Sequence, residues 1–437
     1  MSAETRIDHA ASAPTDRAAM RRAVASSVIG NAFEWFDFLI YGFFTGLIAK
    51  AFFPAEDAFV ATVLATATFA ISYLVRPFGG VLLGMYADRV GRKPALTLMI
   101  LMMGLATLLI GATPDYASIG IAAPLLVVLA RVLQGLSVGG EFASATAMLV
   151  EYAPPGRKML FGSLQMCSQA LAISVAGLFG WGLSTLLAPE DLAGWGWRVP
   201  FLLGLLIAPV GFYIRRRVEE SPSFVAARRQ GHTISFAQLL RDHYGALLAG
   251  LGVCVVGTVS NYVWFISMPR YVVDELGLPF SDALLGTLIC GAILFVLCPL
   301  TGWLADRFGA RRVLCIGAVL FGALSYPLLA WVVAAPELGR LITAQVGIAI
   351  VISLIWGPTP GMMAGLFPTG TRSTGMAVSY NLGVLLFGGL APLTLAVLIE
   401  KTGNNLMPAW YIIFCAALAL VLIGFGTTRT PNAAAPA

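Results

Sequence analysis

The chain has 437 residues, of which 58% are hydrophobic and 11% are charged, and its formal net charge is +5. A soluble domain carries about 25% charged residues because its surface must be solvated, so this composition argues against a soluble protein. Apolar runs, each near the roughly 20 residues that cross a bilayer as a helix, fill most of the chain. Lipid offers no partners for unpaired backbone groups, and the alternating pattern of a membrane barrel is missing. The sequence therefore predicts an all-α membrane protein.

The apolar runs form two sets of six, separated by a polar stretch from Arg215 to Asp242. In chain order, the twelve predicted transmembrane helices are 23–49, 59–87, 94–112, 121–150, 158–186, 198–215, 243–268, 282–305, 313–334, 339–366, 373–399 and 408–428. The polar stretch is interpreted as a linker between two pseudo-symmetric six-helix bundles. The predicted parts are an N-terminal tail (1–22), an N-terminal bundle (23–217), a linker (218–242), a C-terminal bundle (243–428) and a short tail (429–437).

Basic residues gather on one side of these spans. With the N-terminus inside, 20 of the 27 Lys and Arg residues fall on cytoplasmic segments. The opposite side holds only Lys50, Arg198, Arg270, Arg340 and Lys401. Because cytoplasmic loops carry an excess of Lys and Arg, both termini and the linker are predicted to be cytoplasmic. The positive net charge thus reflects membrane orientation and not nucleic-acid binding.

No segment predicts a cofactor, a metal site or a cleaved leader. The first 22 residues are polar, and the apolar run after them is too long for a signal peptide. All six cysteines fall within predicted spans, and the three histidines are too scattered for a metal site. The sequence has no phosphate-binding G-x-x-x-x-G-K-[ST] loop, so we expect no ATP-driven step.

A charged turn occurs twice, at equivalent places in the two halves. The first copy follows the second span and reads Gly84-Met-Tyr-Ala-Asp88-Arg89-Val-Gly91-Arg92-Lys93. The second copy follows the eighth span and reads Gly302-Trp-Leu-Ala-Asp306-Arg307-Phe-Gly309-Ala-Arg311-Arg312. The two aspartates are 218 residues apart, about half the chain. Such an internal repeat is typical of duplicated transporter architecture.

These turns resemble the signature loop of the major facilitator superfamily, G-x-x-x-D-R-x-G-R-[KR], although the second copy has Ala310 in place of an arginine. Other segments narrow the resemblance, among them Gly30-Asn-Ala-Phe-Glu34-Trp-Phe-Asp37, Arg131-Val-Leu-Gln134-Gly135 and Gly139-Gly140-Glu141. Together they are similar to the metabolite:proton symporter family, which includes carriers of citrate, 2-oxoglutarate, shikimate and proline/betaine. The resemblance covers residues 22 to about 428. It implies symport of a small metabolite with protons across a bacterial inner membrane.

Asp88 and Asp306 lie at the same place in the two halves, close to basic residues. A small change in the distance between helices makes or breaks charge-assisted hydrogen bonds, so each turn is interpreted as a latch that stabilises one access state. The alternative is that the basic residues only fix the membrane orientation. The candidate latch residues are Gly84, Asp88, Arg89, Gly91, Arg92, Asp306, Arg307 and Arg311.

Ionisable residues inside spans are costly and mark candidate functional positions. The deeply placed ones all lie in the first half, and they are Glu34, Asp37, Arg76, Arg131 and Glu141. At 1.5 Å per residue, the first three lie about 15–22 Å from the cytoplasmic ends of their helices, near mid-membrane. Helical spacing adds Tyr41 to the face of Asp37 and Gln134 to the face of Arg131.

These positions hold three carboxylates and two guanidinium groups, which leaves one negative charge in excess. Burying an unpaired carboxylate is expensive, and binding a proton is the usual escape. We therefore predict Asp37 as the proton-coupling residue, with Glu34 as the second choice. The alternative is a permanent structural ion pair of Asp37 with Arg131 or of Glu34 with Arg76. Glu141, beside a glycine pair, is equally consistent with a helix contact.

Uncharged polar and aromatic residues complete the candidate substrate site. They are Gln165, Gln169, Asn261, Tyr262, Trp356, Tyr380 and Asn381. The aromatic residues are also consistent with packing, whereas a mid-span amide must find partners or line water. The run from Gly135 to Gly139 matches the G-x-S-x-G nucleophile elbow, but it lies mid-helix and is interpreted as helix packing. Pro358 and Pro360 predict a broken helix in the tenth span.

The predicted function is proton-coupled symport by alternating access, with no enzymatic activity and no required oligomer. Two mid-membrane arginines, Arg76 and Arg131, favour a small organic anion, a di- or tricarboxylate, because guanidinium binds carboxylate bidentately. A zwitterionic osmolyte of the proline or betaine type is the alternative substrate. A non-transporting membrane receptor is the alternative of another class, but it leaves the charge excess and both latch turns without a role.

Overall fold

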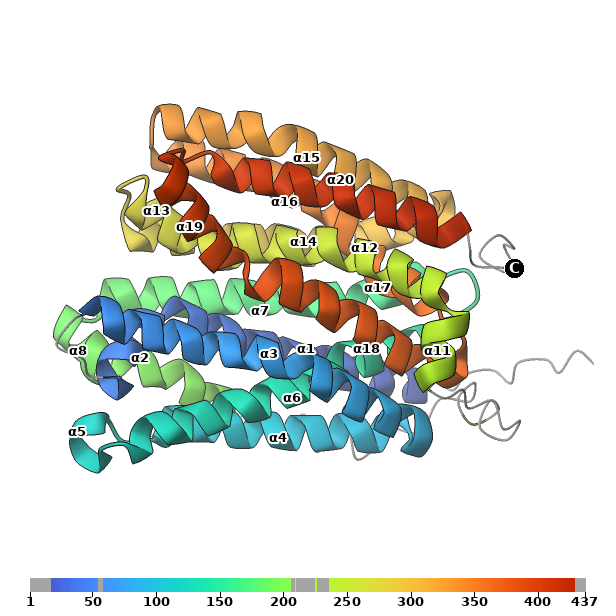
Figure 1. Ribbon diagram of the computed structural model, residues 1–437, viewed down its shortest axis with the longest axis horizontal. Helices are drawn as coiled ribbons and strands as arrows, with labels where there is room; N and C mark the ends of the chain where they lie inside the picture. The colour runs from blue at the N-terminus through green and yellow to red at the C-terminus, as the bar shows by residue number, and fades with distance from the viewer. Residues whose placement is uncertain (1–16, 54–57, 206–208, 210–224, 226–235, 429–437) are drawn as a thin grey trace, which may run out of the picture.

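The computed structural model describes residues 17–53, 58–205, 209, 225 and 236–428, and the regular structure within these residues is helical throughout. Ten of the described helical segments are long and apolar enough to cross a membrane. The long helices run side by side, with α5, α8 and α13 at one end of the bundle and α11 at the other (Figure 1). The first of these is the α8 end of the bundle, and the second is the α11 end.

The N-terminal half is described up to Leu205. Its helices are α1 (Arg17–Phe43), α2 (Thr45–Phe52), α3 (Ala58–Val90), α4 (Arg92–Ala112), α5 (Tyr116–Ile119), α6 (Ala122–Glu151), α7 (Lys158–Leu186) and α8 (Pro189–Gly194). A 3-10 turn at Gly196–Arg198 leads into a further helix. The predicted first span 23–49 is thus divided between α1 and α2. The predicted boundary at 217/218 and most of the linker lie outside the described residues.

The C-terminal half begins with a short helix and continues through interrupted long ones. Its helices are α11 (Phe236–Asp242), α12 (Tyr244–Asn261), α13 (Met268–Asp274), α14 (Phe280–Phe308), α15 (Ala310–Ala334), α16 (Leu338–Trp356), α17 (Thr359–Gly365), α18 (Arg372–Gly383), α19 (Ala391–Thr402) and α20 (Met407–Thr428). π-Helical turns at Tyr262–Ser267 and Val384–Gly389 join α12 to α13 and α18 to α19. The break between α16 and α17 confirms the prediction from Pro358 and Pro360.

Both copies of the charged turn contain a glycine with a positive φ. Gly91 (φ 135°) separates α3 from α4, and Gly309 (φ 95°) separates α14 from α15. An L side chain is strained at such a positive φ, so the direct passage from one helix to the next favours glycine. The backbone of the turn therefore requires the repeated glycine, but it does not require the aspartate three residues earlier.

Small residues let the helices approach one another closely. Between the halves, α7 packs along α14, where Gly302 faces Ser163 and Gly291 faces Ser174. Within the N-terminal half, Gly139 on α6 lies against the backbone of α3. Close backbone approach through small residues is the usual means of helix association in lipid. The helix-packing interpretation of the G-x-S-x-G match is therefore confirmed.

Candidate functional site

Asp37 lies inside the N-terminal half and is linked to Arg131 through an amide. Asp37 on α1 and Gln134 and Arg131 on α6 are each at most 1% exposed. Gln134 Nε2 donates to Asp37 Oδ2, while Gln134 Oε1 accepts from Arg131 Nη1 at 2.5 Å. Thr107 on α4 donates to the other carboxylate oxygen, Oδ1, at 2.8 Å. The structure thus brings the predicted acid and base together, with Gln134 between them.

Aromatic rings surround both buried arginines. Arg131 Cζ lies 4.1 Å from the centre of the Tyr41 ring and 4.7 Å from that of Phe38. Arg76 Cζ lies 5.0 Å from the Phe38 ring and 5.1 Å from the Tyr73 ring. The face of an aromatic ring attracts a cation, and this attraction is stronger where water is excluded. These rings therefore help to stabilise two positive charges within the bundle.

Arg76 also connects the two halves. Its Nη1 donates to the hydroxyl group of Tyr262 at 3.2 Å, and Tyr262 is the first residue of the π-helical turn after α12. Tyr73, about one turn before Arg76 on α3, packs edge-to-face on Tyr262 with ring centres 5.5 Å apart. Separating the halves at this level would break both contacts.

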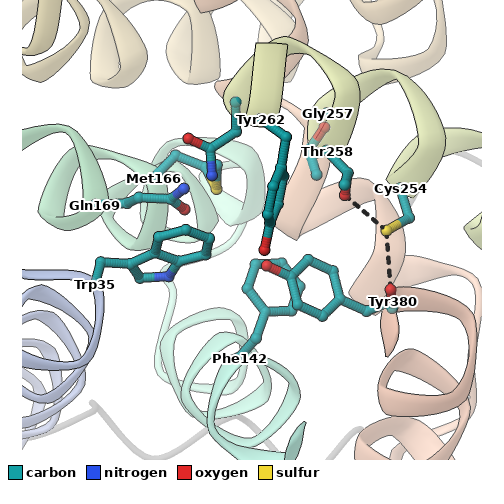
Figure 2. A pocket seen from close by; sticks show the side chains of 11 residues that line it. Trp35, Phe142, Met166, Gln169, Cys254, Gly257, Thr258, Tyr262 and Tyr380 are labelled. Carbon is teal, nitrogen blue, oxygen red and sulfur yellow. Dashed lines mark hydrogen bonds between the residues drawn. The ribbon is translucent and has the colours of Figure 1, made fainter. Parts of the chain in front are cut away.

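A cavity of about 20 Å³ lies between the halves, which is room for one water molecule. Trp35 and Phe142 of the N-terminal half and Tyr262 and Tyr380 of the C-terminal half line it (Figure 2). The Phe142 and Tyr380 rings are stacked, with centres 4.0 Å apart. The remaining lining residues are Met166, Gln169, Cys254, Gly257, Thr258, Asn261 and Thr359. A metabolite needs a wider space, so the halves must move apart before a solute can enter.

Glu34 and Glu141 face a second, smaller cavity of about 10 Å³. Each is 3% exposed, and Met99, Ile100 and Met103 of α4 supply apolar walls. Neither carboxylate belongs to the lining of the cavity between the halves. The two glutamates therefore share one apolar space on the α4 side of α1 and α6.

Of the seven uncharged polar and aromatic residues that complete the predicted substrate site, three lie outside the lining of the cavity between the halves. Gln165 Nε2 donates to Asn31 Oδ1 at 2.7 Å, and Asn31 Nδ2 donates to the Gln165 carbonyl at 2.9 Å. Trp356 Nε1 donates to a serine hydroxyl on α12 at 2.9 Å. Asn381 Nδ2 donates to the Gly139 carbonyl at 2.6 Å and so ties α18 to α6. In this conformation the three side chains hold helices together.

Asp88 joins the two halves at the α11 end. Its Oδ2 accepts from the backbone N–H of Thr374 at 2.9 Å and from the Thr374 hydroxyl at 2.6 Å, at the start of α18. Its Oδ1 accepts from Arg92 Nη1 at 2.7 Å. Arg92 Nη2 also donates to the carbonyl of Thr369 at 3.0 Å. The aspartate and the arginine of the first turn thus both bind the C-terminal half.

Glu151 extends this network from the end of α6. Its Oε1 accepts from Arg372 Nη1 at 2.9 Å and lies 3.5 Å from Arg92 Nη2. Gly84 allows the close approach, because a Cβ there would lie 3.2 Å from the Cα of Thr374. The result is a buried set of charges that spans the boundary between the halves.

Asp306 makes the corresponding contact in the opposite direction. Its two carboxylate oxygens accept from the backbone N–H groups of Met159 at 2.8 Å and Leu160 at 2.9 Å, at the start of α7. A carboxylate at a helix N-terminus satisfies free N–H groups and complements the helix dipole. Three other charged residues of the two turns were predicted as part of the latch. They are exposed in the structure, and they are Arg89, Arg307 and Arg311.

Several residues that the structure brings into these sites were not predicted from the sequence. Trp35 and Phe142 each directly follow a predicted acidic residue, and this position beside Glu34 and Glu141 is the signal that points to them. Thr107 is the deeper of two threonines in an otherwise apolar span. Glu151 directly follows the predicted span 121–150, where an isolated carboxylate next to basic turns is itself a signal.

Comparison with known proteins agrees with this architecture. The family model described as "Sugar (and other) transporter" matches residues 23–233 and 226–435. The "Citrate-proton symporter" of Salmonella typhi is 34% identical over 404 residues, which cover 92% of this chain and 93% of that protein. The "Proline/betaine transporter" of Escherichia coli (strain K12) is 33% identical over 422 residues, which cover 93% of this chain and 83% of that protein.

Solved structures share the fold. The proton:xylose symporter XylE superimposes with a TM-score of 0.77 at 16% identity, covering 93% of this chain and 95% of that one. The predicted fold of twelve transmembrane helices in two bundles is therefore confirmed, and the relatives are transporters and not enzymes. This chain is a multi-pass membrane transporter that belongs to the major facilitator superfamily, in the family described as sugar (and other) transporters.

Proposed function

We propose that the chain couples the transport of a small carboxylate-bearing solute to the movement of a proton in the same direction. The observation that carries this proposal is the buried series Asp37–Gln134–Arg131. When Asp37 is ionised, its charge offsets that of Arg131 through the intervening amide. When Asp37 binds a proton, the charge of Arg131 is left for a solute carboxylate. Proton and solute each remove the other's electrostatic penalty, so they bind together.

A small organic anion is the favoured substrate. Arg76 and Arg131 bring two guanidinium groups to the middle of the bundle, and both contact the ring of Phe38. Guanidinium binds carboxylate bidentately, which suits a di- or tricarboxylate. Similarity to the citrate-proton symporter supports this choice.

A zwitterion of the betaine type is the second candidate, and one observation favours it. Trp35, Phe142, Tyr262 and Tyr380 line the cavity between the halves, and no Asp, Glu, Lys or Arg is among its lining residues. Such an aromatic enclosure suits a quaternary ammonium group. Arg76, bonded to Tyr262 at its edge, then supplies a single partner for a carboxylate. Similarity to the proline/betaine transporter supports this alternative.

The coupling is tested with Asp37→Asn in proteoliposomes. Uptake of labelled citrate or labelled glycine betaine driven by a pH gradient should fall at least about tenfold, because the amide cannot exchange a proton. Counterflow exchange of the same solute should persist, since a neutral amide resembles the protonated acid. Gradient-driven accumulation at the wild-type level in this variant would move the proton site to Glu34 or dismiss it.

The substrate class is tested with Trp35→Ala. If the solute is a zwitterion, this substitution should weaken glycine betaine uptake about tenfold or more, because a cation–π contact contributes about 2 kcal/mol or more in a desolvated site. If the solute is an anion, wild-type uptake should be competed by citrate and not by glycine betaine. Competition by both at equal strength would contradict a choice between the two classes.

The two charged turns latch the α11 end, and the excess of basic residues orients the protein in the membrane. Asp88 and Asp306, each bound to the start of a helix in the other half, hold the α11 end closed in one access state. The excess of basic residues assigns this end, with both termini, to the cytoplasmic side of a bacterial inner membrane. The transporter acts without ATP or nucleic acid, and its two halves suffice for transport without an oligomer.

A further inference from the structure

Thr107 on α4 holds a hydrogen-bonding position with two possible acceptors. Its side chain is buried, 1% exposed, in a helix whose span is otherwise nearly all apolar. Its hydroxyl oxygen lies 2.8 Å from Asp37 Oδ1 and 3.0 Å from the carbonyl oxygen of Met103. A threonine hydroxyl has one hydrogen and two lone pairs, so it donates to one of these acceptors at a time.

We propose that Thr107 is a positioning residue of the proton site, whose hydroxyl changes acceptor with the protonation state of Asp37. This inference rests on the proposed function, in which Asp37 carries the proton. With Asp37 ionised, the Thr107 O–H donates to Oδ1. With a proton on Oδ1, the new Asp37 O–H donates to Thr107 Oγ1, and the Thr107 hydrogen turns to the Met103 carbonyl. Both states are fully hydrogen-bonded, and no heavy atom has to move.

The other carboxylate oxygen cannot play this part. Asp37 Oδ2 accepts from Gln134 Nε2, and the amide is held in that orientation because its oxygen accepts from Arg131 Nη1. A proton on Oδ2 would face an N–H donor and find no acceptor there. The geometry therefore selects Oδ1, on the α4 side, as the oxygen that takes and releases the proton.

The charged and titratable groups around Asp37 come from elements other than α4. Arg131 comes from α6, Arg76 from α3, Tyr262 from the π-helical turn, and Glu34 and Tyr41 from α1 itself. Along their described lengths, α4 beyond Lys93 and α7 beyond Lys158 carry no Asp, Glu, Lys, Arg or His. Thr107 is therefore the polar group that α4 presents to the proton site.

The Thr107 side chain presents its methyl group and its hydroxyl to different neighbours. A Cβ built at Gly204 would lie 3.7 Å from Thr107 Cγ2, so the methyl group points toward that glycine. The hydroxyl points toward Asp37 on α1. Valine has the same shape without the hydroxyl, and serine keeps the hydroxyl without the methyl group.

The experiment compares Thr107→Val with Thr107→Ser in proteoliposomes, using whichever of labelled citrate and labelled glycine betaine the wild type accumulates. Valine removes both the donor to the ionised carboxylate and the acceptor of the protonated one. Because the hydrogen bond to the charged form is the stronger of the two, its loss favours the protonated form. The alkaline limb of the uptake–pH profile should shift upward by about one pH unit, and net uptake should slow while exchange persists. Thr107→Ser should retain the wild-type pH profile.

Two outcomes overturn the inference. One is an unshifted profile for Thr107→Val, and the other is an equal loss of uptake in both variants without a shift, which would indicate packing alone. Asp37→Asn, measured in parallel, separates this inference from the proposed function. If Asp37→Asn loses coupling while Thr107→Val has the wild-type profile, only the role of Thr107 fails. If Asp37→Asn retains coupling, the proton site itself is wrong.

Discussion

Asp88 and Thr374 are 286 residues apart in the chain, yet one carboxylate oxygen of Asp88 accepts from both the backbone N–H and the hydroxyl of Thr374. The aspartate is 7% exposed, and its other oxygen is held by Arg92. The contact therefore links the end of α3 to the start of α18 across the boundary between the halves. A hydrogen bond to a charged group contributes about 1.5–3 kcal/mol, which is enough to bias a two-state equilibrium between access states at least about tenfold.

Asp88→Asn should open the α11 end. The amide keeps the shape of the side chain, but it weakens the bonds to Thr374 and removes one of the two carboxylates that lie beside Arg92. We expect uptake to fall about tenfold or more while the protein still reaches the membrane. A cysteine introduced at Thr369 should react faster with a membrane-impermeant thiol reagent applied from the cytoplasmic side.

Asp274→Asn is the matched control for this substitution. Asp274 pairs with Arg270 at 2.8 Å on the surface, where both side chains are at least half exposed. Exposed pairs contribute about 0–1 kcal/mol, so uptake and cysteine reactivity should stay at the wild-type level. If Asp88→Asn behaves like this control, the first turn fixes membrane orientation only.

The sequence drew attention to Asp88 and Asp306 but not to their partners. Asp88 and Asp306 could be identified because the same turn occurs twice, and a repeat can be detected from the sequence alone. Which helix start each aspartate binds depends on how the two halves meet, and that meeting is set by packing along α7 and α14. For the same reason Glu151 was missed, because its partner Arg372 lies 221 residues away.

The membrane orientation is tested by reporter fusions. A periplasmic reporter placed after Lys50 should be active, and one placed after Arg229 should be inactive. The physical reason is the excess of Lys and Arg on the segments predicted to be cytoplasmic, which hold 20 of the 27 such residues, since such segments are retained in the cytoplasm. A reporter that is active only in the cytoplasm should be inactive after Lys50 and active after Arg229. If each reporter gave the reverse of its expected result at the two sites, the predicted topology would be wrong.

Gly139→Ala should destabilise the N-terminal half. A Cβ at this position would lie 2.6 Å from the backbone nitrogen of Gly80 and 3.0 Å from the carbonyl carbon of Gly79, so α3 and α6 would have to separate. Overpacking of this kind costs about 1–3 kcal/mol. The melting temperature in detergent should fall, whereas Gly182→Ala on α7, where a Cβ meets nothing within 4 Å, should leave it unchanged or raise it.

The charged part of the candidate site was predictable, and its aromatic part was not. Asp37, Arg76 and Arg131 were identified because a charge inside an apolar span is costly wherever it points. Trp35 and Phe142 are as common in packed helix interfaces as in binding sites, so their presence alone carried no information. Their place in the cavity lining follows from the way α1 and α6 turn them toward Tyr262 and Tyr380 (Figure 2).

Arg131 is either the anchor for the solute or a structural partner of Asp37, and substitutions at this position distinguish the two roles. Arg131→Ala should abolish binding of the transported solute, and Arg131→Lys should lose much of it, because an ammonium group cannot reproduce the planar fork of guanidinium. Lysine also leaves Gln134 without the donor that orients its amide, so proton coupling should weaken as well.

Arg131→Ala combined with Asp37→Asn removes both charges and is the control for simple charge imbalance. If the double variant folds stably but does not bind labelled solute in an equilibrium assay, Arg131 is the anchor. Binding that survives Arg131→Ala would shift the solute carboxylate to Arg76 and favour a zwitterion held between Arg76 and the aromatic residues of the cavity.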